Sequence, residues 1–251
     1  MENAGRAVAD AATALLKDCT GHKIVVLAGK GNNGGDGLGA ARWLQNRGAL
    51  VTVVLSCARE DLSGSAADEL QFYLAGGGEL QDKVAVEQLP MLQELLAAAD
   101  LIIDALLGTG FTGELKGVVR DFCQLVNLVA RPVLAVDIPT GVNANDGSAG
   151  RDAIKALATV TMALPKPGLF LYPGRQYVGR LTVADIGMPV AMLQGASSKG
   201  RVLDAKMIAA ALPKRPANMH KGTAGRVLVV AGSLGYTGAA ALCSKACVKA
   251  G

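Results

Sequence analysis

An apolar run of strand length leads directly into a glycine-rich segment at residues 24–37, Ile-Val-Val-Leu-Ala-Gly-Lys-Gly-Asn-Asn-Gly-Gly-Asp-Gly. A turn that only reverses the chain needs few glycines, whereas this one has four after Lys30, set around two asparagines and an aspartate. Such a loop lets a ligand approach the bare backbone while side-chain oxygens converge on it. The segment therefore predicts a strand, a glycine-rich loop and a helix, with a binding site in the loop.

Strand-like and helix-like segments alternate through the first 189 residues. Helices are predicted at 2–18, from Leu38 until Gly48, and at 64–75, 88–98 and 117–129; further strands are predicted at 51–55, 84–86, 101–104, 133–136, 159–163 and 181–184. The strands are nearly continuous apolar runs, which is typical of a parallel sheet covered on both faces. We therefore expect an α/β fold, a three-layer αβα Rossmann-like domain with a mostly parallel sheet, over residues 1–189.

A second, shorter region follows this domain. Residues 190–212 are interpreted as a linker with one short helix near 204–212. Residues 213–251 repeat the opening pattern, with an apolar run at 226–231, a glycine-rich turn and an alanine-rich helix. A single βα unit cannot bury both of its faces. It either docks on the first sheet or begins a second α/β domain whose remainder lies outside this sequence, and we favour the second interpretation.

Composition argues against several classes of function. The net charge of +4 is mild and the basic residues are scattered, which favours an ordinary surface over nucleic-acid binding. No apolar run reaches the roughly 18 residues of a transmembrane helix. The sequence has only two histidines, which argues against a zinc site or a serine–histidine triad. Five cysteines without a C-x-x-C pair predict reduced, mostly buried thiols in a soluble cytoplasmic protein.

Polar clusters follow three of the predicted strands. Asn32, Asn33 and Asp36 follow the first; Asp104 ends another and precedes Gly-Thr-Gly-Phe-Thr-Gly-Glu at 108–114; Asp137 and Thr140 follow a third. The carboxyl ends of parallel strands lie along one edge of the sheet, where ligands bind. A single aspartate at a strand end is commonly a helix cap or turn former. Three clusters at one edge favour a binding site instead.

The residue types in these clusters limit the chemistry. Asn33, Asp104 and Thr140 are hard oxygen donors, which suit a hard cation. Glycine loops at helix starts suit phosphate groups. Asp137 is the best candidate for a general acid or base, since burial and neighbouring charges can move the pKa of a carboxyl toward neutrality. Lys166, between two prolines, is either an exposed loop lysine or a group that meets a phosphate or the reacting ring.

One familiar dinucleotide pattern fits only in part. Residues 29–34 match G-x-G-x-x-G after a strand, but the next strand ends in Leu-Ser-Cys without an acidic residue for a ribose hydroxyl. Glu60 and Asp61 come too late in the chain to be convincing substitutes. A Rossmann oxidoreductase is therefore a weak hypothesis. The P-loop and the G-x-S-x-G hydrolase elbow are absent from the sequence.

Taken together, residues 31–37, 104–113, 136–141 and 165–168 resemble the motifs of the NAD(P)H-hydrate epimerases, in the right order over roughly residues 1–189. Residues 213–251 resemble the opening of an ADP/ATP-dependent NAD(P)H-hydrate dehydratase, which is similar to ribokinase in fold. That order matches fused, bifunctional repair enzymes. The later motifs of a dehydratase lie beyond Gly251, so this chain is not expected to dehydrate its substrate.

The resemblance implies a reaction and a site. An epimerase of this family interconverts the R and S forms of hydrated NADH or NADPH (NADHX, NADPHX) at ring carbon 6, and the partner activity dehydrates the S form with ADP or ATP. Potassium would be held by Asn33, Asp104 and Thr140, and Asp137 and Lys166 are the catalytic candidates. Substrate contacts would come from Asn32, Asn33, Gly34, Gly35, Asp36, Gly108, Thr109, Gly110, Phe111, Thr112, Gly113, Glu114 and Asp137.

Two questions stay open from the sequence. An epimerase-like domain can also act as a non-catalytic ligand-binding or scaffold domain, although a scaffold has no need of Asp137. The preference for NADHX or NADPHX is not evident, and a homo-oligomer is compatible with the sequence. Thr140 stands where serine is commoner in the family, which keeps the hydroxyl but adds a methyl group.

Overall fold

The computed structural model describes residues 1–195 and 200–250, and the chain divides into two units, residues 1–197 and 198–251. In the first unit the strands are β1 (Lys23–Ala28), β2 (Leu50–Leu55), β3 (Glu79–Gln81), β4 (Leu101–Ala105), β5 (Val133–Val136), β6 (Ala158–Met162) and β7 (Arg180–Ala184). Its α-helices are α1 (Glu2–Leu16), α2 (Asn32–Asn46), α3 (Gly64–Ala75), α4 (Leu89–Ala97), α5 (Gly117–Val129), α6 (Arg175–Val178) and α7 (Val190–Gly195).

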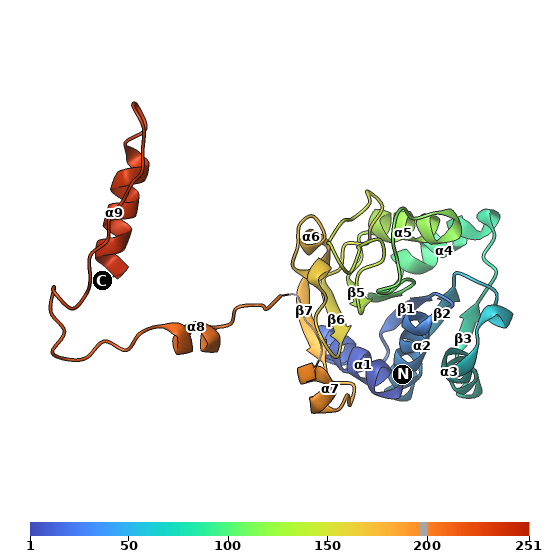
Figure 1. The fold of residues 1–251 in the computed structure, drawn as a ribbon. Helices are drawn as coiled ribbons and strands as arrows, with labels where there is room; N and C mark the ends of the chain where they lie inside the picture. The colour runs from blue at the N-terminus through green and yellow to red at the C-terminus, as the bar shows by residue number, and fades with distance from the viewer. Residues whose placement is uncertain (196–199, 251) are drawn as a thin grey trace. The chain divides into compact units, whose positions relative to one another are not determined.

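The strands form one parallel sheet in the order β3-β2-β1-β4-β5-β6-β7 (Figure 1). Strand β1 lies inside the sheet, with Leu27 paired to Val54 of β2 on one side and to Asp104 of β4, the central strand, on the other. The chain therefore moves outward in one direction from β1 to β3 and then crosses to the other side at β4. The predicted α/β fold with a parallel sheet is confirmed.

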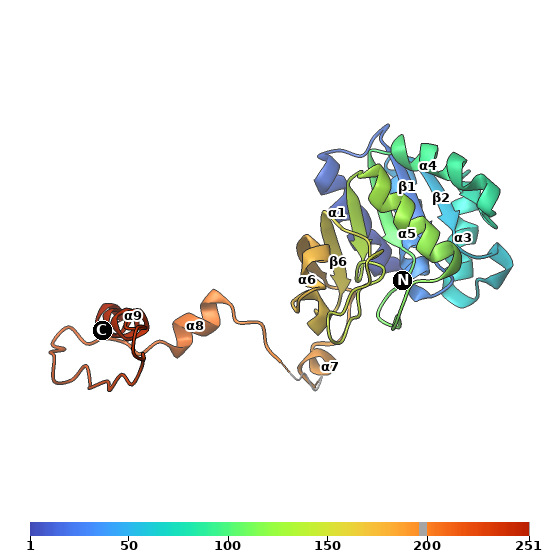
Figure 2. The ribbon, with the colours of Figure 1, turned by 90° about the horizontal axis from the view of Figure 1, so that it is seen from above.

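Helices cover both faces of the sheet, as the sequence predicts. Helices α1, α2 and α3 pack on one face, and α4 and α5 pack on the other (Figures 1 and 2). Strand β1 shows why its run is apolar throughout: Ile24, Val26 and Ala28 contribute to the first core cluster, and Val25 and Leu27 to the second. Successive side chains of a strand point to opposite faces, so both sets must be apolar.

The glycine-rich segment differs from its prediction, because α2 already begins at Asn32 and most of the expected loop is helix. The glycines there permit close packing. A Cβ atom on Gly34 would lie 1.8 Å from the Gly29 carbonyl oxygen, and one on Gly37 would lie 2.4 Å from the Ala105 Cβ. Both distances are far below van der Waals contact. These glycines bring the start of α2 against the ends of β1 and β4.

The strand predicted at 84–86 is wrong. The third strand is β3, Glu79–Gln81, which pairs with Thr52, Val53 and Val54 of β2. Its start is fixed by Tyr73, whose hydroxyl lies 2.8 Å from the Val51 carbonyl oxygen and 3.0 Å from that of Glu79. Residues Val86–Gln88 form a 3₁₀ turn with an exposed valine instead. The apolar residues at 84–86 resemble a strand only in composition.

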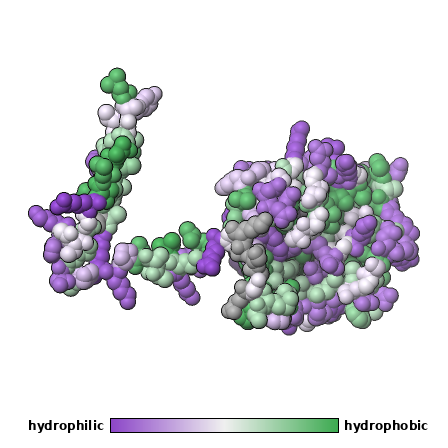
Figure 3. Space-filling model, in the orientation of Figure 1, coloured by the Kyte–Doolittle hydropathy of each residue, from purple (hydrophilic) through white to green (hydrophobic). Residues whose placement is uncertain are grey.

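The second unit contains helices α8 (Ala205–Ala211) and α9 (Gly238–Ala250) and an isolated bridge between Ser233 and Tyr236. The strand predicted at 226–231 is wrong: this segment pairs with no strand within the described residues, and Leu228 and Val230 are 88% and 89% exposed. A strand needs a hydrogen-bonding neighbour, which a lone βα segment does not provide. Figure 3 shows apolar surface along α9.

Two other features of the described ranges bear on the sequence predictions. None of their helices combines the length and the apolar character that a bilayer crossing requires. All five cysteines are free thiols, but only Cys19 and Cys123 are buried, so the expectation of mostly buried thiols is wrong. Cys243 lies on the exposed surface of α9, because that helix packs against little of its own unit.

Candidate active site

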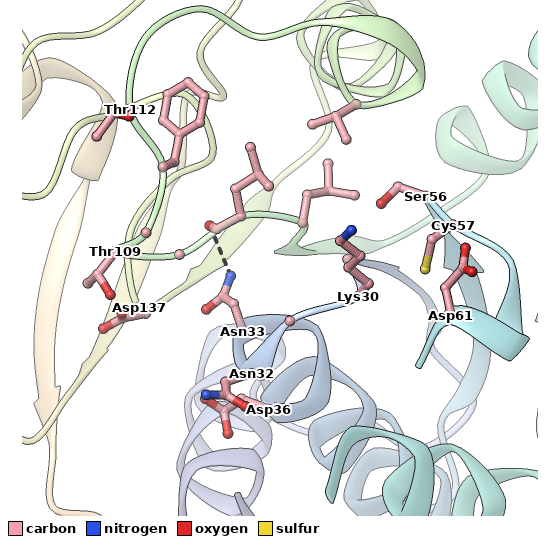
Figure 4. A pocket seen from close by; sticks show the side chains of 18 of the residues that line it. Lys30, Asn32, Asn33, Asp36, Ser56, Cys57, Asp61, Thr109, Thr112 and Asp137 are labelled. Atoms are coloured by element: carbon pink, nitrogen blue, oxygen red, sulfur yellow. Dashed lines mark hydrogen bonds between the residues drawn. The ribbon is translucent and has the colours of Figure 1, made fainter. Parts of the chain in front are cut away.

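A cavity of about 980 Å³ opens at the carboxyl ends of β1, β2 and β4 (Figure 4). This is the point where the strand order changes direction, and ligands of parallel α/β folds bind in the crevice at such points. Of the residues predicted to contact a substrate, those that line the cavity are Asn32, Asn33, Asp36, Gly108, Thr109, Gly110, Phe111, Thr112 and Asp137. The three sequence clusters therefore do meet at one edge of the sheet.

Other predicted residues lie outside the cavity wall. Gly34 and Gly35 are buried where α2 packs against its neighbours, and a Cβ on Gly35 would lie 2.5 Å from the Met1 sulfur. Gly113 and Glu114 are exposed beyond the cavity in the loop that leads to α5. Asp104, Thr140 and Lys166 reach the site only through other residues.

Asp104 is completely buried under the loop that follows β4. Its carboxylate accepts a bond from the Thr140 backbone N–H (2.8 Å) and one from the Thr140 hydroxyl (2.7 Å). A longer bond comes from the Leu106 N–H at 3.3 Å. Burial raises the pKa of Asp104 to about 6, although these bonds favour the charged form. The carboxylate is thus held in place but is short of compensating positive charge.

Asn33 connects this buried carboxylate to the cavity. Its Nδ2 donates to the Leu107 carbonyl oxygen at 3.0 Å, and the Leu107 N–H donates to the Thr140 Oγ1 at 3.1 Å. The Asn33 Oδ1 is buried and has no hydrogen-bond partner among the described residues. A buried carbonyl oxygen without a hydrogen-bond donor costs folding free energy, unless a bound cation serves as its partner. The oxygen donors Asn33, Asp104 and Thr140 therefore fit a hard cation.

Asp137 follows β5 and lies at the opposite wall of the cavity from α2. Its φ of 66° is left-handed, which is uncommon for a residue with a side chain and marks a constrained position. Its Oδ1 accepts bonds from the Thr161 hydroxyl (3.0 Å), the Met162 N–H (3.2 Å) and the Lys166 ammonium (2.5 Å). Among the described residues no hydrogen bond involves its Oδ2, so this oxygen can meet a ligand.

Lys166 is neither a free loop lysine nor a direct ligand of the cavity. Its ammonium donates to Asp137, to the Thr161 hydroxyl at 3.0 Å and to the Met162 carbonyl oxygen at 2.9 Å. The ion pair is largely shielded from water, with side chains 20% and 13% exposed. Lys166 therefore holds the Asp137 carboxylate in one orientation.

Asp36 lies on α2, one turn beyond Asn33, and also faces the cavity (Figure 4). Burial raises its pKa to about 7; the Asp137 and Glu69 carboxylates add to the shift, and the amino terminus and Lys166 oppose it. Asp36 thus exchanges its proton near neutral pH, while Asp137 has an ammonium partner. Two carboxyl groups in such different environments suit an acid and a base acting on one ligand.

Sequence reasoning missed one end of the cavity. Lys30, Ser56, Cys57 and Asp61 also line it. From the sequence, Asp61 is too far from the strand to be convincing, since it lies six residues past the end of β2, but the 3₁₀ turn Arg59–Asp61 brings it back to the strand end. The signal was Asp61 at position N3 of that turn, where its Oδ2 accepts from the Ala58 N–H at 3.3 Å.

The family model described as YjeF-related protein N-terminus matches residues 1–168. The chain belongs to this family. The matched range includes every element that lines the cavity and also Lys166.

Named relatives agree with this assignment. A protein of Moorella thermoacetica named bifunctional NAD(P)H-hydrate repair enzyme Nnr is 42% identical over 252 residues, covering 100% of this chain and 48% of that protein. An NAD(P)H-hydrate epimerase of Pirellula staleyi is 37% identical over 197 residues, covering 77% of this chain and 84% of that protein. The chain thus spans about half the length of the bifunctional relative and most of the epimerase.

A solved structure supports the fold. The crystal structure of the yeast protein ynu0 matches with a TM-score of 0.62 at 25% identity, covering 79% of this chain and 86% of that chain.

Proposed function

We propose that this chain interconverts the R and S epimers of hydrated NADH and NADPH. The observation that carries the proposal is the pair of carboxyl groups, Asp36 and Asp137, in one cavity of a YjeF-related domain. The names of its relatives supply the substrate class.

The reaction needs a proton donor and a proton acceptor at ring carbon 6. This carbon bears a hydroxyl group and is bonded to the ring nitrogen. Once the hydroxyl oxygen is protonated, the nitrogen lone pair forms a C=N bond and the C–O bond breaks. Water leaves with the C–O electron pair. Water then returns to either face and gives up a proton. Asp36, which titrates near pH 7, suits the donor, and the free Oδ2 of Asp137 suits the acceptor. Positioned acid–base groups of this kind contribute roughly 10²–10⁴-fold in rate.

Lys166 is a positioning residue in this proposal. Its ammonium keeps the Asp137 carboxylate oriented through Oδ1 and leaves Oδ2 for the substrate. Thr161 and the Met162 N–H add two further bonds to the same oxygen. The geometry of the base is therefore set by groups that do not touch the reacting carbon.

Potassium is the cation that we propose for Asn33, Asp104 and Thr140. When bound, it would supply positive charge beside the buried Asp104 carboxylate and give the Asn33 Oδ1 the partner that it lacks among the described residues. The residues themselves link the start of α2 to the loops after β4 and β5. Their role is to fix the walls of the cavity.

A second part of the proposal concerns residues 213–251, in the second unit. Residues 213–251 resemble the opening of a dehydratase, and the chain covers 48% of its Moorella relative. We propose that in a longer protein this region continues into a lyase domain that uses ADP or ATP to dehydrate the S epimer. The 251 residues themselves would provide only the isomerase activity.

The proposal is tested by supplying R-enriched NADPH hydrate and following the epimer ratio by chromatography. The native chain is expected to equilibrate the epimers rapidly, and Asp137→Asn to remain near the background rate. Asp146→Asn is a matched control, because Asp146 is an exposed carboxylate whose Oδ1 only accepts bonds from Ser148 in its own turn. Equal rates in native chain and Asp137→Asn would remove Asp137 from its role. No rate in either would favour a non-catalytic binding domain.

A further inference from the structure

The cavity is longer than the acid–base site needs. Asp137 and Thr109 lie at one end and Lys30, Cys57 and Asp61 at the other, with Asn33 and Asp36 between them (Figure 4). A nicotinamide ring at the Asp137 end leaves the second end, at the carboxyl end of β2, without an assigned ligand. No residue of that end belongs to the predicted site.

Lys30 provides a positive charge at this second end. It lies between β1 and α2, separated by one glycine from the end of β1 and by one glycine from the start of α2. Its ammonium forms no ion pair with any described residue, although the cavity wall also contains carboxylates. A lysine next to a helix start that lacks a side-chain cap is typical of positions where a phosphate group binds.

Asp61 and Ser56 provide hydrogen-bonding oxygens beside this charge. Lys30, Cys57 and Asp61 line the same end of the cavity (Figure 4). Asp61 uses its Oδ2 for the Ala58 N–H in its turn, so its other oxygen is directed to no described partner. In Rossmann-like folds a carboxylate at the end of the second strand accepts from a ribose hydroxyl. Here a 3₁₀ turn supplies that carboxylate from further along the chain.

We infer that the cavity end formed by Lys30, Ser56 and Asp61 binds the ADP-ribose part of the dinucleotide hydrate, with the Lys30 ammonium paired to its pyrophosphate and the Asp61 carboxylate accepting from a ribose hydroxyl. This inference rests on the proposed function for the identity of the substrate. Lys30 and Asp61 would then contribute to affinity and leave the chemical step unchanged. The same carboxylate would oppose a 2′-phosphate, since two negative charges would meet there.

The first test uses ADP-ribose as the probe, because it has the pyrophosphate and riboses but no nicotinamide ring. Titration calorimetry with Lys30→Gln is expected to show binding weaker by roughly tenfold or more, the range for losing a hydrogen bond to a charged group. Lys23→Gln is the matched control, since Lys23 begins β1 at the opposite edge of the sheet and is also exposed. ADP-ribose that fails to bind the native chain, or binds both variants equally well, would overturn the inference.

A second test separates this inference from the proposed function. In the epimer assay, Lys30→Gln should raise KM for NADHX with kcat unchanged, and should have no effect on hydrated NMNH, which lacks the ADP part. A KM rise for NADPHX alone would assign Lys30 to the 2′-phosphate and overturn the pyrophosphate assignment. The native chain could lack epimerase activity while Lys30→Gln still weakens ADP-ribose binding. That outcome would refute the proposed function and retain the subsite.

Asp61→Asn gives an independent check on the ribose contact. The amide keeps the shape of the side chain but removes its charge. We expect NADHX to bind more weakly and the ratio of KM values for NADPHX and NADHX to fall, because the repulsion of the 2′-phosphate is removed. An unchanged ratio would contradict the place given to Asp61.

Discussion

Three aspartates at or near the cavity have different surroundings. Asp104 is buried and bonded to Thr140, Asp137 is paired with Lys166, and Asp36 lies against the cavity with a raised pKa. The residue type is the same, but the neighbours differ. On this difference we base the proposed roles: a structural or cation-binding role for the first, and proton-transfer roles for the other two.

Asp36 makes a testable contribution to stability. Its pKa is about 7 in the folded chain and near 3.8 when unfolded, so between these values the folded state binds more protons. The free energy of unfolding should therefore fall as pH rises from about 4 to about 7. Urea unfolding at several pH values should show a shallower fall for Asp36→Asn than for the native chain.

Comparison of the two chains isolates this effect. Asp104 contributes a slope of the same sign, because its pKa is also raised, to about 6, and it remains in the variant. Only the difference between native chain and Asp36→Asn reports on Asp36. Parallel stability curves across this pH window would show that Asp36 has an ordinary pKa, and it would then lose its role as proton donor.

At the element scale the start of α2 is held between two strand ends. A methyl group on Gly34 would collide with the Gly29 carbonyl oxygen, whereas one on Gly31 meets no atom within 4 Å. Gly34→Ala should therefore destabilise the chain by about 3 kcal/mol, the upper part of the usual range for overpacking. Gly31→Ala should cost under about 1 kcal/mol. Urea unfolding of both variants measures this, and equal losses would contradict the packing role.

The proposed cation site would join three elements and should respond to the ion supplied. If potassium binds at Asn33, Asp104 and Thr140, KCl should raise Tm above that in LiCl at equal ionic strength. At a concentration of about 100 Kd the stabilisation is about 2.7 kcal/mol. Asn33→Ala should abolish the difference. Equal Tm values in the two salts for the native chain would count against the site.

Most elements of the first unit are predictable from the sequence because their signals are local. Strand β4 is an apolar run, and α5 shows helical periodicity over the range that it occupies. The start of α2 is not predictable in this way, since glycines disfavour helix locally and only the packing against Gly29 and Ala105 explains them. Asp61 was missed for a similar reason: its position depends on a short turn rather than on its distance along the chain.

At the scale of the whole molecule the two units differ in how they bury apolar residues. Val26 of β1 is fully buried between strands and helices, whereas Leu228 and Val230 are exposed. The apolar run at 226–231 has the composition of a strand but no described partner to complete it. A strand signal in a sequence therefore predicts a strand only where the rest of its sheet is present.

Hydrogen exchange tests this contrast. Backbone amides of residues 24–28 donate within the sheet ladder and should exchange slowly, on the scale of global unfolding. Amides of residues 226–230 should exchange within the dead time, because no ladder bond to another described residue protects them. Slow exchange at 226–230 would show that this segment pairs with a strand after all.

The most direct test of the central claim is a crystal structure of the chain with a bound dinucleotide hydrate. The account predicts the nicotinamide ring in the cavity at the ends of β1 and β4, with the hydroxyl on ring carbon 6 within hydrogen-bonding distance of the Asp137 Oδ2. It also predicts the pyrophosphate next to Lys30. Electron density for the ligand at the opposite edge of the sheet, in the 420 Å³ cavity lined by Lys23 and Glu79, would contradict the account.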